Sequence, residues 1–435
     1  MKIKTLVLAL AMANPMLVAT SARAATVGIN QPAEAITAER IAALPDKERA
    51  AWQAYLARSQ AQEKIDRASL AAELPAGQAT PPLPEKSHGN DMPLDRSAAW
   101  YGSAEARHVA DVIVSFQTPG GGWSKNMRRN GTPRLPGQSY TGNNLSAYLG
   151  ENDFDAPRDR SWNYVSTLDN DATITEMRFL ARVASQAPGK DGDAYRQSFI
   201  KGVNYVLAAQ FPNGGWPQVW PLEGGYHDAI TFNDGAAVHA AQMLSEVASG
   251  KGDYAFVPAE LRARFAEAQT RALANILASQ VVVNGKRTVW GQQHDALTLK
   301  PVAGRNFEPP ALASAESAGV LMYLMSLPNP SKEVVESVRA GIAWLKATAI
   351  HNKAWVAGAT REEGRHVVDT NQDSPIWARY YDVASARPVF GDRDKTLHDK
   401  VDELSLERRN GYAWYNNGAQ RALQLYAEWA RAHPL

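Results

Sequence analysis

Two short runs of acidic and amide side chains stand where helices are predicted to begin. One is Asp169, Asn170 and Asp171, and the other is Asn233 and Asp234. An Asp or Asn at a helix start is most often an N-cap, but one helix needs only one or two caps, and these runs exceed that need. Carboxylate and amide oxygens are the ligands that calcium prefers, and the sequence lacks both cysteine and paired histidines at helical spacing. The pattern therefore favours calcium over zinc.

A third polar segment, residues 290–308, carries cations. Lys300 and Arg305 lie in it, shortly before Pro309 and Pro310, which keep the segment from continuing as helix. If this segment shares one surface with the acidic runs, its cations could act together with them on an anionic ligand. A charged loop is more often only a solvated loop, and for each residue alone that interpretation stays open.

The elements that must position these loops are helices. Apolar residues recur at spacings of three and four along most of the chain, and no alternating strand pattern of comparable length competes with them. We therefore predict an all-α fold. The predicted helices are 102–117, 172–187, 193–210, 234–249, 258–280, 312–327, 331–349 and 419–432. Thr173 and Glu176 are expected to form a capping box at the second of these helices.

The connections between the predicted helices alternate between short and long. The long connections are 118–171, 211–233, 281–311 and 350–418. Helical hairpins closed by short turns place their long connections at the opposite end, so all four should share one rim. Long loops are usually functional, and we expect the active site there.

Two of the long loops begin with a similar pattern. Residues 116–123 read FQTPGGGW and residues 209–216 read AQFPNGGW, each after a helix of the same parity. This similarity indicates an internal repeat of helical hairpins. Such a repeat favours an α/α barrel or toroid over an open bundle.

The N-terminal part of the chain divides into two segments. Residues 1–24 have the basic start, short apolar run and small-residue end of a secretory signal peptide. Residues 25–94 contain one or two predicted helices over 33–72, followed by a proline-rich linker. This second segment is either a small independent bundle or a strap on the main domain. The toroid itself is assigned to residues 95–435.

Charge and composition limit the partners. The chain has 46 Lys and Arg against 45 Asp and Glu, so no overall field attracts nucleic acid or an anionic membrane. A preference for an anionic ligand must be local. We expect a secreted or periplasmic monomer that binds neither nucleic acid nor a membrane.

Seven motifs, in this order along the chain, resemble those of family 10 polysaccharide lyases. They are GGGWSKN at 120–126, STLDNDAT at 166–173, FPNGGWPQV at 211–219, ITFND at 230–234, HDALTLKP at 294–301, GRNFEPPALASAES at 304–317 and WARYYD at 377–382. Seven ordered motifs are far more specific than one. The N-terminal segment lies outside the resemblance.

The resemblance implies an (α/α)3 toroid and a pectate lyase. Such an enzyme cleaves α-1,4-linked polygalacturonate by calcium-dependent anti β-elimination and gives 4,5-unsaturated products. By motif position, Asp169 and Asp234 resemble residues of the calcium and substrate site, and Arg305 resembles the Brønsted base.

Further residues are expected to bind the substrate. Lys125 belongs to the first motif, and Asn170 adjoins the metal position. Lys300 and Arg379 are expected to hold carboxylates. An arginine base conflicts with the usual pKa of arginine, which exceeds about 12. Either nearby cations lower the pKa of Arg305, or Arg305 stabilises charge while another group takes the proton.

Two other function classes stay open on the residues alone. One is an α/α-barrel glycoside hydrolase in which Asp169 and Asp234 are the acid and the base, which needs no calcium and gives saturated products. The other is a non-catalytic carbohydrate-binding toroid, whose tryptophan-rich loops stack on sugars without turnover.

Overall fold

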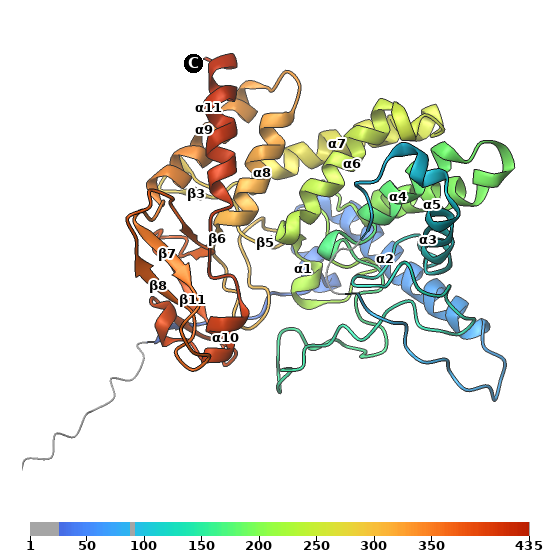
Figure 1. The fold of residues 1–435 in the computed structure, drawn as a ribbon, viewed down its shortest axis with the longest axis horizontal. Helices are drawn as coiled ribbons and strands as arrows, with labels where there is room; N and C mark the ends of the chain where they lie inside the picture. Colours follow the sequence, from blue (N-terminus) through green and yellow to red (C-terminus); the bar gives the residue numbers. More distant parts are fainter. Residues whose placement is uncertain (1–25, 88–91, 435) are drawn as a thin grey trace, which may run out of the picture.

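The computed structural model describes residues 26–87 and 92–434, and most of its regular structure is helical (Figure 1). The signal peptide predicted for residues 1–24 lies outside the described residues. The helices are α1 (Ala38–Ala42), α2 (Asp46–Ala72), α3 (Ala104–Ser115), α4 (Ile174–Gln186), α5 (Asp193–Ala209), α6 (Ala236–Ser249), α7 (Ala259–Ser279), α8 (Ser314–Ser326), α9 (Lys332–Ala347), α10 (Leu406–Gly411) and α11 (Ala419–Ala432). The eight helices predicted beyond the linker are confirmed to within two residues at each end.

Three helical hairpins form the body of the molecule. The pairs α4 and α5, α6 and α7, and α8 and α9 each pack together across a short connection. Helix α6 also contacts α4 and α8, so the first helices of the three hairpins lie next to one another. Figure 1 shows α3 to α7 on one side of the molecule and α8, α9 and α11 on the other. The first helices begin at the end of the body that carries the long loops.

Apolar stripes hold these helices together. Helix α4 buries Met177, Leu180 and Ala184 along one face, and α6 buries Ala240 and Leu244 in the same way. A spacing of three or four residues keeps these side chains on one side of a helix. Each fully buried leucine or methionine contributes about 1.5–3 kcal/mol to the free energy of unfolding.

A repeated tryptophan ties each long loop to the helix before it. The indole N–H groups of Trp123, Trp216, Trp290 and Trp377 donate to the carbonyls of Ile113, Val206, Ile276 and Leu345 at 2.7, 2.9, 2.7 and 2.8 Å. All four rings are fully buried. The repeat predicted from two loops is confirmed, and the structure extends it to all four.

Glycines in the turns explain why residues 116–123 and 209–216 have similar sequences. Gly121 and Gly214 have φ angles of 104° and 95°. A Cβ on either would lie only 2.4 or 2.1 Å from the carbonyl oxygen of Lys201 or Arg271, respectively. These carbonyls belong to α5 and α7, so each turn rests directly on the backbone of the following hairpin. Only glycine combines this φ with such a close approach.

The strands are short and mostly belong to the long loops. A three-stranded sheet joins β1 (Thr26–Ile29), β12 (Thr396–His398) and β11 (Phe390–Gly391), and β7 (Lys353–Val356) forms a hairpin with β8 (His366–Asp369). Two-residue ladders pair β2 (Ile230–Thr231) with β5 (Gln293–His294), β3 (Val282–Val283) with β4 (Lys286–Arg287), β6 (Leu312–Ala313) with β10 (Tyr380–Tyr381), and β9 (Trp377–Ala378) with β13 (Tyr415–Asn416). All pairings are antiparallel. Strands this short show no alternation that the sequence could have revealed.

The N-terminal segment is a strap on the main body. Tyr55 of α2 packs against Phe211 with 5.1 Å between ring centroids, and its hydroxyl donates to the carbonyl of Ala209 at 2.9 Å. Near the other end of the strap, the amide of Asn30 donates to the carbonyl of Asn306 at 2.9 Å. The segment therefore contacts both the α3 to α7 side and the loop that precedes α8. No helix in the described part of the chain is long and apolar enough to cross a membrane.

The tryptophan repeat predicts a stability effect. Replacing Trp290 with Phe removes the donor to the carbonyl of Ile276 and part of a fully buried ring, so urea unfolding should show a loss of about 2–3 kcal/mol. Trp100→Phe is the matched control, because Trp100 is only half-buried and bonds weakly to Glu105 at 3.3 Å. Equal losses in the two variants would show that the repeated tryptophan is not a special anchor.

Candidate active site

The two acidic runs form tight turns directly before α4 and α6. They are the 3₁₀ turns Asp169–Asp171 and Asn233–Gly235, which pack against each other, and the second also packs against α8. Asn170 and Asp234 have φ angles of 51° and 50°, in the left-handed region that Asn and Asp tolerate better than most residues. The starts of three helices therefore meet at one place, as the loop lengths predicted.

The predicted capping box is wrong. Thr173 has a φ angle of 69° and its side chain makes no cap bond to α4. Its hydroxyl instead donates to the carbonyl of Thr167 at 2.9 Å and accepts from the N–H of Trp123 at 3.0 Å. Glu176 is buried in an ion pair with Arg129 at 2.5 Å. Both side chains join separate loops, which is a tertiary role that the local motif does not reveal.

Asp169 is a buried carboxylate held by side chains from three segments of the chain. Its Oδ2 is 2.5 Å from Lys125 Nζ, and its Oδ1 accepts from the amides of Gln218 at 2.8 Å and Asn233 at 3.2 Å. Burial raises the pKa of Asp169, but the ion pair with Lys125, the Gln218 bond and the charge of Arg305 together hold it below its usual value. Asp169 is therefore a stable anion.

Asp234 is joined to Asp169 through Asn233. The Asn233 amide also donates to Oδ2 of Asp234, at 2.9 Å. Although Asp234 is exposed, desolvation by the surrounding protein and the negative charge of Asp169 raise its pKa to about 6. The amide of Asn233 thus bridges two carboxylates. The sequence pattern included Asn233 but did not identify it as a bridge.

Arg305 lies against a buried acid. Its guanidinium is 2.5 Å from Glu308 Oε1, and its backbone N–H donates to Oε2 of the same residue at 2.8 Å. Tyr412 donates to Glu308 at 2.6 Å. Burial lowers the pKa of Arg305, but the charge of Glu308 outweighs it and raises the pKa well above its ordinary value. Arg305 is therefore a cation.

Arg379 forms the second arginine pair. It lies 2.7 Å from Glu316, at the start of α8, and 3.4 Å from Oδ1 of Asn233. Its guanidinium carbon is 4.8 Å from the ring centroid of Tyr412, whereas that of Arg305 is 5.7 Å from the same ring. Tyr412 therefore contacts both arginines. Glu308, Glu316 and Tyr412 are partners that the sequence reasoning missed.

Lys125 lies between Asp169 and a group of buried tyrosines. Its Nζ is 3.4 Å from the ring centroid of Tyr164, whose hydroxyl is 3.1 Å from that of Tyr226. Both tyrosines donate to the carboxylate of Asp155. Burial raises the pKa of Asp155, although the Tyr226 bond and the charges of Arg305 and Lys125 oppose that shift. These tyrosines lie in loops, where no repeating pattern in the sequence indicates which side chains are buried.

Of the two remaining predicted residues, Asn170 lies in the cluster and Lys300 does not contact it. Asn170 donates to Asn126 at 3.0 Å, directly beside Lys125, and so belongs to the cluster. Lys300 is exposed, and along the described chain its side chain forms no ion pair within 4 Å. The structure therefore brings together Lys125, Asp169, Asn170, Asp234, Arg305 and Arg379. It does not join Lys300 to them, and the carboxylate-binding role of Lys300 stays a prediction.

The donor set suits calcium but is incomplete. Among the described residues no group of three or more His, Cys, Asp or Glu side chains is arranged to hold a metal ion. Asp169 and Asp234 offer carboxylate oxygens, and the buried Oε1 of Gln218 has no hydrogen-bond partner in the described structure. Hard oxygen donors of this kind fit calcium, which takes six to eight of them. Further oxygens must come from water or from an acidic ligand.

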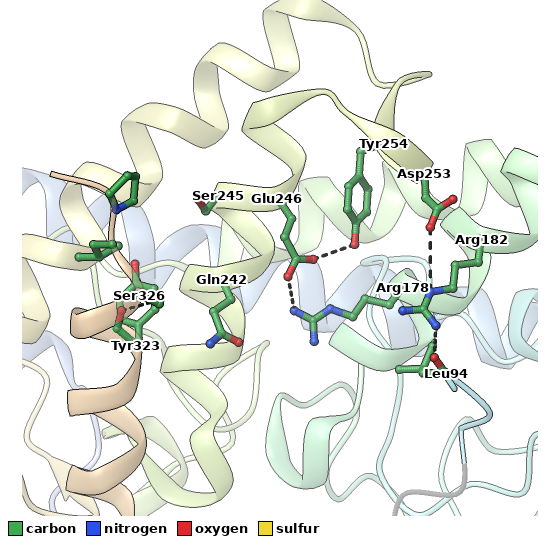
Figure 2. Close-up of a pocket in the computed structure, with 12 residues that line it drawn as sticks. Leu94, Arg178, Arg182, Gln242, Ser245, Glu246, Asp253, Tyr254, Tyr323 and Ser326 are labelled. Carbon is green, nitrogen blue, oxygen red and sulfur yellow. Dashed lines mark hydrogen bonds and ion pairs between the residues drawn. The ribbon is translucent and has the colours of Figure 1, made fainter. Parts of the chain in front are cut away.

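A separate cavity lies toward the C-terminal ends of α6 and α8. It has a volume of about 720 Å³ and is lined by the C-terminal parts of α6 and α8 and by α4 (Figure 2). Its charged groups are paired with one another, for example Arg178 with Glu246 at 2.8 Å and Arg182 with Asp253 at 4.0 Å. None of the predicted site residues lines it, so volume alone does not locate the chemistry.

Comparisons with known proteins give matches by sequence and by structure. Residues 117–423 match the family model described as pectic acid lyase. The chain is similar to the family 10 polysaccharide lyase from Cellvibrio cellulosa, with 30% identity, a TM-score of 0.64, and coverage of 79% of this chain and 99% of that chain. The chain is also similar to a mutant of that enzyme in complex with trigalacturonic acid, with 30% identity, a TM-score of 0.63, and coverage of 78% of this chain and 99% of that chain. A search of curated proteins found no match.

These findings confirm the predicted fold and the predicted resemblance. The matched structures are family 10 polysaccharide lyases, and nearly the whole of each is covered by this chain. Three helical hairpins with long loops on one rim are the (α/α)3 toroid expected from the sequence. The matched region also contains every residue of the cluster described above. This chain belongs to the pectic acid lyase family.

Proposed function

We propose that this lyase cleaves α-1,4-linked polygalacturonate by calcium-dependent anti β-elimination, giving 4,5-unsaturated oligogalacturonates. The observation that carries the proposal is the pair of carboxylates bridged by Asn233, with two arginines on the same rim. The complex of the similar Cellvibrio enzyme with trigalacturonic acid supports an acidic sugar as the ligand. Lyase family membership disfavours the glycoside hydrolase and the non-catalytic binding toroid.

The reaction needs positive charge beside the substrate carboxylate. A base removes the proton at C5 of a galacturonate, and the electron pair forms the C4–C5 double bond. The glycosidic C4–O bond breaks, and its electron pair leaves on the oxygen, which then takes up a proton. Negative charge develops on the carboxylate attached to C5. Lys125 and Arg379 would stabilise that charge more in the transition state than in the ground state.

The calcium ion would be held by Asp169 and Asp234. When bound, it supplies a Lewis acid that polarises the substrate carboxylate and makes the C5 proton more acidic. Lys125 pairs with Asp169, so this buried carboxylate has an opposite charge beside it. The incomplete set of protein oxygens is consistent with an acidic substrate that completes the ligands.

Arg305 is proposed as the proton acceptor. Its side chain is 38% exposed, so it can reach a ligand on the rim. The Glu308 carboxylate keeps it protonated. Proton abstraction therefore requires this pairing to weaken, and positive charge brought near Arg305 lowers the pKa of an arginine.

We also propose that the protein acts outside the cytoplasm as a secreted or periplasmic monomer. The support is the signal-peptide pattern of residues 1–24 and the polymeric nature of the proposed substrate. A chain of polygalacturonate reaches an enzyme more readily outside the cell than within it. N-terminal sequencing of the mature protein tests the cleavage after Ala24.

Calcium binding and turnover should depend on the two aspartates. A chelator should abolish turnover and calcium should restore it, and Asp169→Ala and Asp234→Ala should each lose at least tenfold in rate. Because the pKa of Asp234 is raised to about 6, its carboxylate is protonated as the pH falls through 6. Calorimetry should therefore show an affinity for calcium that falls about tenfold from pH 7 to pH 5.

The chelator experiment has a clear contrary result. Full turnover in excess chelator would remove calcium from the mechanism. Variants that merely melt earlier while keeping their turnover would show that both aspartates are helix caps, each worth about 1 kcal/mol.

Arg305→Lys tests the base. Lysine keeps a cation but loses the guanidinium geometry, so turnover should fall by roughly 10² or more, while affinity for a short oligogalacturonate changes little. Arg305→Ala run in parallel, with folding checked by circular dichroism, separates a base from an electrostatic clamp. Near wild-type turnover in the lysine variant would rule out Arg305 as the base.

Arg379 and Lys300 should differ as carboxylate binders. Arg379→Gln combined with Glu316→Gln, which leaves no buried charge unpaired, should raise KM several-fold and weaken its dependence on salt. Lys300→Gln should have a smaller effect, because an exposed cation is screened by solvent. Equal kinetics at low and high salt for wild type and both variants would place these cations outside the binding groove.

A further inference from the structure

A second, smaller cavity lies on the outer part of the 350–418 loop. It has a volume of about 290 Å³ and opens between the β7–β8 hairpin and β13. This volume is close to the lower end of small-molecule sites, roughly 300–1,000 Å³. Its lining combines aromatic, cationic and amide side chains. The residues used below are Lys353, Trp355, Arg365, Gln372, Tyr415 and Asn416.

Two aromatic rings form one wall. The ring centroids of Trp355 and Tyr415 are 5.3 Å apart with an interplanar angle of 44°. The guanidinium carbon of Arg365 lies 5.3 Å from the Trp355 ring centroid. The indole Nε1 of Trp355 and the Nε of Arg365 are buried and have no hydrogen-bond partner within the described structure. Flat rings beside a guanidinium suit a ligand with an apolar face and a negatively charged edge.

The cavity carries one uncompensated positive charge. Lys353 is paired with Asp369 at 2.5 Å. No carboxylate in the described residues lies within 4 Å of the Arg365 guanidinium. A planar guanidinium with free N–H donors matches a carboxylate. The amide of Gln372, which also lines the cavity, can bond a hydroxyl. Together these groups match a sugar acid better than a neutral sugar or an inorganic anion.

The cavity is close to the catalytic cluster along the backbone. In the β9–β13 ladder, Asn416 lies opposite Trp377 and Tyr415 lies opposite Ala378. Arg379 follows directly, and its N–H donates to the carbonyl of Trp414 at 2.7 Å. Asn416 thus lies beside a residue that is two positions before Arg379, a distance of about 7 Å along the strand. Asn416 therefore shares a face of the ladder with Arg379, whereas Tyr415 points to the other face, so a polymer held at Arg379 reaches the aromatic wall only by passing the edge of this two-stranded ladder.

We propose that the cavity of Trp355, Arg365 and Tyr415 is an accessory binding site for a uronate residue of the polymeric substrate, outside the catalytic centre. The choice of galacturonate as that uronate rests on the proposed function. A chain bound at both places pays little extra entropy for the second contact, so its overall affinity exceeds that of either site alone. An oligomer too short to span both sites gains nothing from the accessory site.

Affinity electrophoresis of the whole protein in gels containing polygalacturonate tests this site directly. Excess chelator stops calcium-dependent turnover during the run. Trp355→Ala and Arg365→Gln should each weaken retention by roughly three- to tenfold, as expected for the loss of one stacking or one charge-assisted contact. Arg361→Gln is the matched control, because Arg361 is exposed near the tip of the same hairpin and does not line the cavity.

Kinetics give a second readout with calcium present. For both variants KM on long-chain polygalacturonate should rise by a similar factor, while kcat/KM on trigalacturonate should stay within about twofold of wild type. Arg365→Lys should recover part of the retention, because it keeps the charge. Circular dichroism of each variant confirms that the fold is intact.

Several results would overturn the accessory site. Retention of both variants equal to that of Arg361→Gln would do so, as would equal retention of the wild type in gels of neutral galactan. Equal losses on trigalacturonate and on the long polymer would place these residues in the catalytic groove instead. A wild-type protein that fails to form unsaturated product but is retained through Trp355 and Arg365 would contradict the proposed function and leave the accessory site standing.

Discussion

The buried carboxylate of Asp169 is the constraint on which the site depends. A charge removed from water costs several kcal/mol unless opposite charge and hydrogen bonds replace the lost hydration. Here Lys125 comes from the first long loop, Gln218 from the second, and Asn233 from the turn before α6. Satisfying one carboxylate therefore fixes three segments relative to one another. The side chain of Asn233 also donates to Asp234 and accepts from Arg379, so the same network includes both of these residues.

The two arginines differ in their surroundings, and the roles proposed for them follow from that difference. Each is paired with a buried glutamate, Glu308 or Glu316, and both contact Tyr412. Arg379 is nearly enclosed and fixed between Glu316 and Asn233, which suits a group that holds charge. Arg305 keeps more exposure and pairs with a neighbour only three residues away. This freedom suits a group that must exchange a proton.

Much of the fold could be predicted from the sequence because its signals are local. Apolar spacing over a dozen or more residues defines each long helix, and alternating loop lengths place the site on one rim. The third copy of the tryptophan repeat escaped detection because the β3–β4 hairpin lengthens the stretch between α7 and Trp290. Strands of two to four residues leave no readable pattern.

Only those residues of the site that stand in a sequence motif could be predicted. Asp169, Asp234, Arg305 and Arg379 stand in motifs, and the structure brings them together. Their partners depend on contacts distant in sequence: Tyr412 lies 104 residues from Glu308. Local rules failed at Thr173, whose left-handed backbone allows no cap. Whether the N-terminal segment is a bundle or a strap also depends on packing that composition does not encode.

The most direct test of the central claim is the pH dependence of kcat for wild type and Glu308→Gln. The Glu308 charge raises the pKa of Arg305, so removing that charge lowers it. If Arg305 takes the C5 proton, kcat rises with pH as the arginine loses its own proton, and this rise should move to lower pH in the variant. A rise at the same pH in both proteins, at similar calcium saturation, would contradict Arg305 as the proton acceptor.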